Sequence, residues 1–409
     1  MDSYLSAMGN LHPKPLGDLP DSVLLYAENG LDRRTGDRGR KHLHIVLIVG
    51  LIRTILAAVT ATIALVLLLP LFLLILPFWL VSVLTRGIAR MIEPEFLTRE
   101  QLIQFDPVFG WRARPNLDTH HLMVDVFHIR TDQDGWRGDH SLTESDIVVF
   151  GDSFAAGYGV SDRHFFANLS GGYKIKSVGI GGYSMVQELL WMTELKNSLH
   201  RKLVVWFIYY GNDLFDNLMP DLRGYRKPFV RENGVSEEWE IVSSHVAPEQ
   251  WTIIHQGRMQ GQHHIPKLAE LCSETFLAKR AYAASEYLIG KGKQICDEVE
   301  AQLVVVGIPD AIQLTTTGRQ NLKALGGEST SFDADRPDKE LARICDRRGV
   351  QFQAGKTFLD AGCYKINDCH WNEKGHRRVC EAVNALARNR RGGARAKSEP
   401  AESGAFVQA

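Results

Sequence analysis

Between about residues 145 and 390, short runs of β-branched and other apolar residues alternate with longer segments of helical periodicity. The predicted strands are Ile147–Phe150, Lys174–Val178, Leu203–Tyr209, Leu303–Ile308 and Val350–Phe352. The predicted helices lie at roughly 184–199, 266–300 and 337–348. Continuous apolar strands separated by helices are typical of a parallel sheet covered on both faces. The pattern therefore predicts a three-layer α/β domain with a mainly five-stranded parallel sheet.

A much longer apolar run precedes this domain. It extends from Ile45 to Leu84 and is interrupted mainly by Arg53, Pro70 and Pro77. Since about 20 apolar residues cross a bilayer, the run predicts a transmembrane or membrane-embedded anchor over residues 44–86. The long polar stretch before it argues against a cleavable signal peptide.

The basic residues around this run bear on its orientation. Those before it are Arg33, Arg34, Arg38, Arg40 and Lys41, and those after it are Arg86, Arg90 and Arg99. Because cytoplasmic flanks are enriched in basic residues, this bias favours a cytoplasmic N-terminus and an extracytoplasmic C-terminal domain. The alternative is a hairpin anchor that turns near Pro70 and leaves the domain on the cytoplasmic face.

Composition divides the rest of the chain. Residues 1–43 and 391–409 are rich in Gly and charged residues and are predicted to be flexible tails. Residues 87–144 are predicted to be a connecting segment with short strands, and residues 145–390 the main domain. Within that domain, residues 213–264 form an irregular insertion, which is predicted to be a lid or a binding surface. Its aromatic residues Tyr225, Trp239 and Trp251 either stack on sugar rings or fill a subsidiary core.

Charge and cysteine content exclude some functions. Lys and Arg number 47 and Asp and Glu 48 in the 409 residues, so no nucleic-acid partner is predicted. The six cysteines contain no CxxC pair, which disfavours a structural zinc site. An exported domain would pair them, Cys363 and Cys369 being nearest in sequence, whereas a cytoplasmic one would keep them reduced.

Residues suited to chemistry follow the predicted strands. They are Gly151-Asp152-Ser153 after the first strand, Gly179 to Ser184 after the second, Tyr210-Gly211-Asn212 after the third, and Asp368-Cys369-His370-Trp371-Asn372 near the domain end. Each segment alone is also what an ordinary turn or helix cap contains. Because the carboxyl ends of parallel strands meet at one edge, their joint occurrence predicts a single site.

These residue types fit acyl transfer. His370 is suited to take the proton of Ser153, while Asp368 fixes the tautomer of the imidazole and stabilises the imidazolium. The side-chain amide of Asn212 is a donor suited to an oxyanion. A serine nucleophile with a histidine base is the resulting hypothesis.

The four segments resemble the motifs of the SGNH (GDSL) hydrolases. The resemblance implies a flavodoxin-like fold, with Ser153 as nucleophile, His370 as base and Asp368 as its acidic partner. It also implies an oxyanion hole made by the backbone N–H groups of Ser153 and Gly182 and the side chain of Asn212.

The resemblance covers about residues 145–388, with two departures. The family's acid usually lies three residues before the histidine, where this chain has Asn367; Asp368 lies two before it. The third motif is usually Gly-x-Asn, whereas Gly211 directly precedes Asn212 here.

The predicted function is a serine esterase that hydrolyses a small acyl ester, with acetyl favoured, on an envelope glycan. The alternatives are an O-acyltransferase, a lipid esterase or thioesterase with the same triad, and a glycan-binding protein without turnover. The predicted partners are an acylated glycan or small molecule and, through residues 44–86, a membrane. No cofactor is predicted, and no metal, because neither the histidines at 120, 121 and 128 nor those at 263 and 264 have a carboxylate or cysteine set at ligand spacing.

Overall fold

The computed structural model describes residues 36–92, 102–122, 125–222, 225–234, 238–243, 264–326, 331–366 and 368–398. The chain divides into two units, Met1–Ile92 and Glu93–Ala409, which are described separately below.

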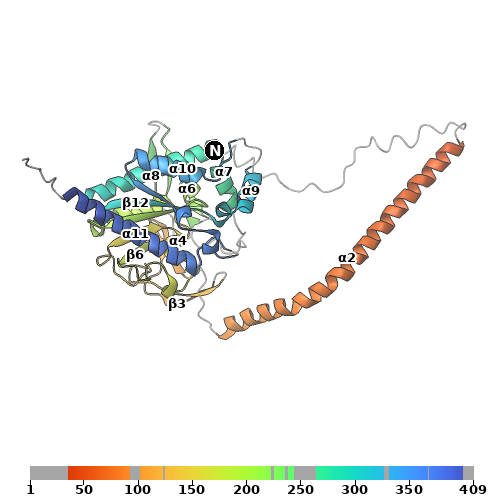
Figure 1. Ribbon diagram of the computed structural model, residues 1–409, viewed down its shortest axis with the longest axis horizontal. Helices are drawn as coiled ribbons and strands as arrows, with labels where there is room; N and C mark the ends of the chain where they lie inside the picture. Colours follow the sequence, from red (N-terminus) through yellow and green to blue (C-terminus); the bar gives the residue numbers. More distant parts are fainter. Residues whose placement is uncertain are drawn as a thin grey trace, which may run out of the picture. The chain divides into compact units, whose positions relative to one another are not determined.

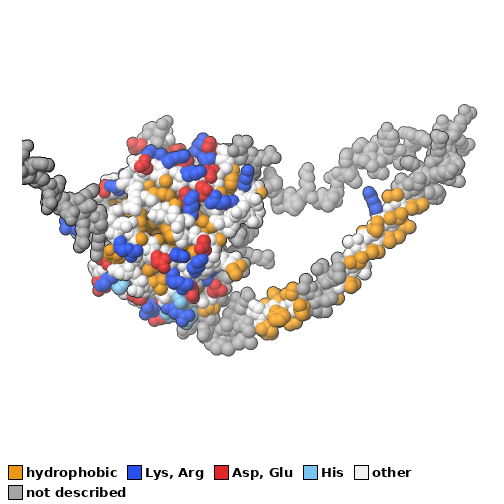
Figure 2. Space-filling view, in the orientation of Figure 1, with side chains coloured by type: hydrophobic (Ala, Val, Ile, Leu, Met, Phe, Trp, Pro, Cys, Tyr) orange, Lys and Arg blue, Asp and Glu red, His pale blue; other side chains and the backbone are white. Residues whose placement is uncertain are grey.

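The first unit contains one long helix, α2 (Gly36–Ile92, 57 residues). It is continuous through the positions of Pro70 and Pro77 and has no turn near Pro70. Apolar side chains such as Leu51 and Phe78 are exposed, and Figure 2 shows hydrophobic side chains on the surface of α2. Among the described residues, no helix is both long enough and apolar enough to cross a membrane, so the predicted anchor at 44–86 gains no support here.

The second unit is built on a five-stranded parallel sheet, which confirms the predicted one. Its strands are β5 (Ile147–Gly151), β6 (Ile175–Gly179), β7 (Leu203–Tyr209), β12 (Gln302–Ile308) and β13 (Gln351–Ala354), in the order β13-β12-β7-β5-β6. Numbered along the chain this order is 2-1-3-4-5, the flavodoxin-like doubly wound arrangement. The strand order reverses between β5 and β7, and such a switch point opens a crevice at the carboxyl ends of the strands.

Alternate strand residues enter two separate cores, one on each face of the sheet. Val148 and Phe150 of β5 pack in one core, and Val149 packs in the other. The helices α5 (Met185–Glu194), α8 (Phe276–Glu298) and α10 (Arg336–Arg347) cover the first face, and α11 (Glu373–Ser398) covers the second. Figure 1 shows helices on both sides of β12. The two cores give the three layers that the sequence predicts.

Several helix boundaries differ from the prediction. The stretch 266–300 forms two helices, α7 (His264–Leu271) and α8, because Thr275 caps α8 by accepting a hydrogen bond from the Ala278 N–H. The stretch 184–199 forms α5 and the 3-10 turn η3 (Lys196–Leu199). Helix α9 (Thr316–Leu325) was not predicted, and α11 runs to Ser398, into the predicted tail that starts at 391.

Short elements complete the unit. The connecting segment forms the antiparallel hairpins β1 (Ile103–Asp106) with β2 (Gly110–Ala113) and β3 (Asp118–Leu122) with β4 (Val126–Arg130). The insertion forms α6 (Asp213–Asp216) and the hairpins β8 (Asp221–Leu222) with β9 (Tyr225–Arg226) and β10 (Phe229–Glu232) with β11 (Trp239–Val242). Tyr225 and Trp239 pack against the first core, which favours the subsidiary-core interpretation for them. Trp251 lies outside the described residues.

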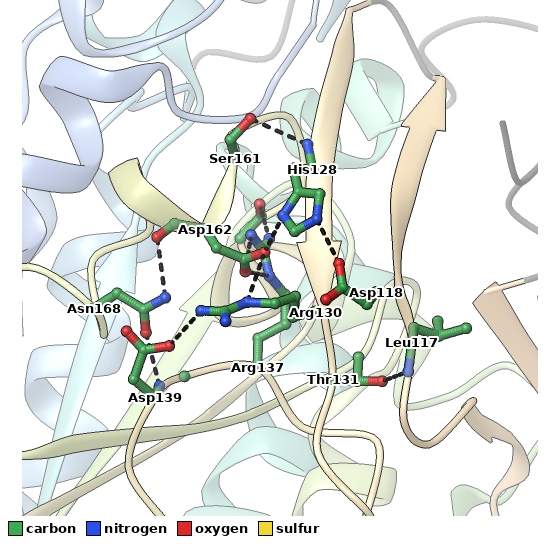
Figure 3. A network of polar contacts seen from close by, with 12 residues as sticks. Leu117, Asp118, His128, Arg130, Thr131, Arg137, Asp139, Ser161, Asp162 and Asn168 are labelled. Atoms are coloured by element: carbon green, nitrogen blue, oxygen red, sulfur yellow. Dashed lines mark hydrogen bonds and ion pairs between the residues drawn. The ribbon is translucent and has the colours of Figure 1, made fainter. Parts of the chain in front are cut away.

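A buried arginine holds the segment that follows the serine turn. The guanidinium of Arg137 donates to the carbonyl oxygens of Ala156 (3.0 Å), Gly157 (2.7 Å) and Val160 (3.1 Å) and to Asp162 Oδ1 (2.9 Å). Figure 3 shows this network, in which the carboxylate of Asp162 also lies 3.0 Å from Nδ1 of His128 on β4. The arginine thereby satisfies carbonyl groups that would otherwise be buried without donors.

We predict that Arg137→Met destabilises the protein by about 3–5 kcal/mol, because the buried Asp162 carboxylate loses its guanidinium partner and the carbonyl groups of Ala156, Gly157 and Val160 lose their donor. The free energy of unfolding in urea measures the loss. The matched control is Arg231→Met: Arg231 is 60% exposed and paired with Glu240, so its loss should cost less than about 1 kcal/mol. Equal losses in the two variants would contradict the assigned role of Arg137.

Candidate active site

Ser153 lies where β5 ends. It is the first residue of α4 (Ser153–Ala156), and Asp152 caps this helix by accepting a hydrogen bond from the Phe154 N–H at 2.9 Å. The tight turn is possible because α4 packs directly on Gly179 at the end of β6, where an added Cβ would lie 2.4 Å from the Ala156 nitrogen. The turn therefore brings Ser153 to the carboxyl edge of the sheet at its switch point.

The structure brings Ser153, His370 and Asp368 together. Nε2 of His370 lies 2.7 Å from Oγ of Ser153, and Nδ1 lies 2.7 Å from Oδ1 of Asp368. Both distances are those of well-formed hydrogen bonds. The three side chains thus form one continuous chain from carboxylate to imidazole to hydroxyl, the arrangement of a serine nucleophile and its base.

The loop that carries His370 is fixed by the Trp-Asn pair that follows it. Trp371 is buried against the rings of Phe154 (4.8 Å between centroids) and Phe207 (5.7 Å). The Asn372 side chain donates to the carbonyl of Tyr364 at 2.8 Å and accepts from the Gly375 N–H at 3.1 Å, so it caps α11. These contacts explain why His370 is placed rigidly although it lies outside a strand or helix.

The acid at the shortened spacing makes the contact with His370. Asp368, two residues before the histidine, is its hydrogen-bond partner. Asn367, which occupies the position usual in the resembled family, lies outside the described residues.

Burial and neighbouring groups set the ionisation of this pair. Burial alone disfavours the imidazolium, but the side chains of Cys369 and Asp368 outweigh it and raise the pKa of His370 well above its ordinary value. Burial alone raises the pKa of Asp368, but the hydrogen bond from His370 outweighs it and lowers that pKa to about 2. The pair is therefore a stabilised imidazolium–carboxylate in the free protein at mildly acidic pH.

The three predicted oxyanion donors also follow strands at this edge. Ser153 comes after β5, Gly182 after β6 and Asn212 after β7. The strands β5 and β6 end side by side, since their last residues Gly151 and Gly179 pair with each other. Gly182 has φ +80°, a conformation that residues with a Cβ rarely adopt.

Asp152 orients Asn212, a role that the sequence analysis missed. Oδ2 of Asp152 accepts a hydrogen bond from Nδ2 of Asn212 at 3.2 Å and lies 3.4 Å from Oγ of Ser153. The contact directs the amide nitrogen, rather than the amide oxygen, toward the carboxylate. Burial raises the pKa of Asp152. Asp152 is adjacent to Ser153 in the sequence, but the sequence alone does not indicate that its carboxylate bonds to Asn212.

Asp368, Cys369 and His370 each place one ligand atom within 4.8 Å of the others, a spacing that a metal ion also uses. Both ring nitrogens of His370 are already hydrogen-bonded, so a metal ion there would have to displace Asp368 or Ser153. The donor set fits the proton chain better than a metal site.

No protein-family model matches the chain, and no curated protein matches it in sequence. Similar solved structures include the carbohydrate acetylesterase Est24 from Sinorhizobium meliloti, with 12% identity and a TM-score of 0.34 over 59% of this chain and 98% of that chain. They also include an extracellular lipase from Streptomyces rimosus, with 18% identity and a TM-score of 0.33 over 59% of this chain and 99% of that chain. Both are ester hydrolases by name. At these identities and scores, the likeness assigns no activity to this chain.

We predict that Asp368→Asn lowers kcat by roughly 10²–10⁴-fold, because an asparagine donor favours the wrong imidazole tautomer. The neutral imidazole is the base, so kcat/KM rises with pH through the pKa of His370, which the carboxylate keeps high. In the variant this acid limb should therefore shift to lower pH. The matched control is Asp360→Asn, which removes an exposed ion pair with Lys374 and should change neither kcat nor the pH dependence of kcat/KM. If the acid limb of Asp368→Asn stays at the pH of the wild type, the role assigned to Asp368 is contradicted.

Proposed function

We propose that the protein is a serine esterase of the SGNH (GDSL) type that hydrolyses a small acyl ester through a seryl-ester intermediate. The observation that carries the proposal is the hydrogen-bonded chain from Asp368 through His370 to Ser153 at the switch point of the sheet. A non-catalytic protein would not require the 2.7 Å contact between nucleophile and base.

The proposed reaction uses this chain in both half-reactions. His370 Nε2 takes the Ser153 proton as Oγ attacks the ester carbonyl carbon, and the carbonyl electron pair moves onto oxygen. The N–H groups of Ser153 and Gly182 and the Asn212 amide stabilise this oxyanion. Its collapse breaks the bond to the alcohol oxygen, which takes the proton from His370. Water then repeats the sequence, releasing the carboxylic acid and restoring Ser153.

Tyr158 favours a small acyl group. Its ring centroid lies 6.0 Å from that of His370, and a Cβ added to Gly181 would lie 2.5 Å from the same ring. The buried ring therefore fills space between the base and the loop that carries Gly182. We propose acetyl as the acyl group and an envelope glycan as the alcohol, with water as the acceptor.

We predict that Ser153→Ala abolishes both labelling by a fluorophosphonate probe and turnover of p-nitrophenyl acetate. Circular dichroism should show an intact fold, because the change removes one partly buried oxygen. Ser198→Ala, in the turn at the amino end of β7, is the control and should keep both activities. Labelling that persists in Ser153→Ala would identify a different nucleophile.

The location of this domain is a separate proposal, based on the basic residues before the apolar run and on the exposed apolar side chains of α2. We propose that the N-terminus is cytoplasmic and the esterase domain extracytoplasmic.

The measurement is a pair of reporters fused at the C-terminus, of which alkaline phosphatase requires export and green fluorescent protein requires the cytoplasm. We expect phosphatase activity without fluorescence. Fluorescence without phosphatase activity would place the domain in the cytoplasm and contradict the proposal.

A further inference from the structure

A second histidine–carboxylate pair lies at the same edge of the sheet. Nε2 of His264 lies 3.2 Å from Oδ2 of Asp310, and the Tyr209 hydroxyl donates to the same oxygen at 2.5 Å. The other oxygen of Asp310 accepts from the Ile312 N–H at 2.9 Å. None of these four residues takes part in the proton chain to Ser153.

The register of the sheet places this cluster beside the oxyanion donor. Ile308 at the end of β12 pairs with Tyr209 at the end of β7. A Cβ added to Gly211, the neighbour of Asn212, would lie 2.6 Å from the Tyr209 hydroxyl that donates to Asp310. Because β7 separates β12 from β5 and adjacent strands are about 4.8 Å apart, the cluster lies roughly 10 Å from the strand that carries Ser153.

Ring contacts link the cluster to the proposed base. The centroid of His264 lies 6.2 Å from that of Tyr209, which lies 4.5 Å from Phe154, which lies 5.2 Å from His370. The cluster is therefore linked to the proposed base by three ring contacts, a separation that a substrate atom several bonds from the ester carbonyl can span.

The hydrogen bonds fix what His264 presents. Burial alone raises the pKa of Asp310, but hydrogen bonds from His264, the Ile312 N–H and Tyr209 outweigh it and lower that pKa. Nε2 of His264 donates to this carboxylate, which leaves Nδ1 as the ring nitrogen that can hydrogen-bond to a ligand. The His264 side chain is 19% exposed and that of Asp310 only 6%, so solvent reaches the imidazole and not its anchor.

We propose that His264, held by Asp310 and Tyr209, binds a hydroxyl group in the alcohol part of the ester. The inference rests on the proposed esterase function and narrows its substrates to esters of polyols or sugars. A ligand hydroxyl donates to Nδ1 of His264, while the ester carbonyl is placed at Ser153. A simple ester without such a hydroxyl gains nothing from this contact.

The test compares p-nitrophenyl acetate with a mono-O-acetylated methyl glucoside. His264→Gln keeps an amide donor able to reach Asp310 but has no acceptor at the Nδ1 position, and His264→Leu removes both. We expect both variants to raise KM for the glucoside and to lower its kcat/KM, relative to that for p-nitrophenyl acetate, by about tenfold, the size of one hydrogen bond. His200→Gln, at the opposite edge before β7, is the matched control and should leave this ratio unchanged.

The outcomes separate the two levels of the proposal. A purely structural role for His264 predicts that His264→Gln behaves like the wild type, and that result overturns the inference. Equal losses on both esters, or a wild type active only on p-nitrophenyl acetate, also overturn it while leaving the esterase function intact. A wild type that turns over neither ester overturns the esterase function, and the inference with it.

Discussion

The hydrogen bond between Ser153 and His370 joins residues 217 positions apart in the sequence. It forms only if the end of β5 and the loop before α11 lie at the same edge of the sheet. The positions of these two segments depend on how the side chains at that edge pack. Trp371 is buried against Phe154, the residue after the serine, so the two loops share one apolar contact. Ser153 and His370 are thus positioned by a single packing arrangement rather than by separate supports.

Behind this edge the interior contains several ionisable groups whose charge burial suppresses. Burial raises the pKa values of Asp152, Glu188 and Asp213, and it lowers the pKa of Lys227 to about 8. Each has a hydrogen-bond partner: Glu188 accepts from the Trp206 indole at 2.6 Å, for example. The carboxylate hydrogen-bonded to His370 is Asp368, whose pKa is lowered to about 2. This arrangement favours an imidazolium at His370 during proton transfer.

The hydrophobic pattern predicted the elements of the sheet but not their order, which only the resemblance to the SGNH hydrolases implied. Every predicted strand lies within two residues of an observed one, because a strand buried on both faces has an unbroken apolar run. The order β13-β12-β7-β5-β6 has no such local signal, since it is set by how the connecting helices cross the sheet. In the site, Ser153, Asn212 and His370 were predicted because each stands in a short motif. Asp310 also follows a strand end, but its partner His264 lies 46 positions earlier with no fixed spacing, so sequence alone did not join them.

In the proposed esterase reaction, strand order separates the two parts of the ester along one edge of the sheet. Gly182 and Tyr158 lie on the β6 side of Ser153, where the ring of Tyr158 restricts the space next to Gly181. Asp310 and His264 lie on the β12 side, beyond Asn212, where polar atoms replace apolar ones. A carbonyl carbon at Ser153 has its acyl group on one side and its alcohol oxygen on the other. The proposed substrate therefore binds with its small acyl group toward β6, next to Tyr158. Its hydroxylated alcohol part then lies toward β12, next to His264.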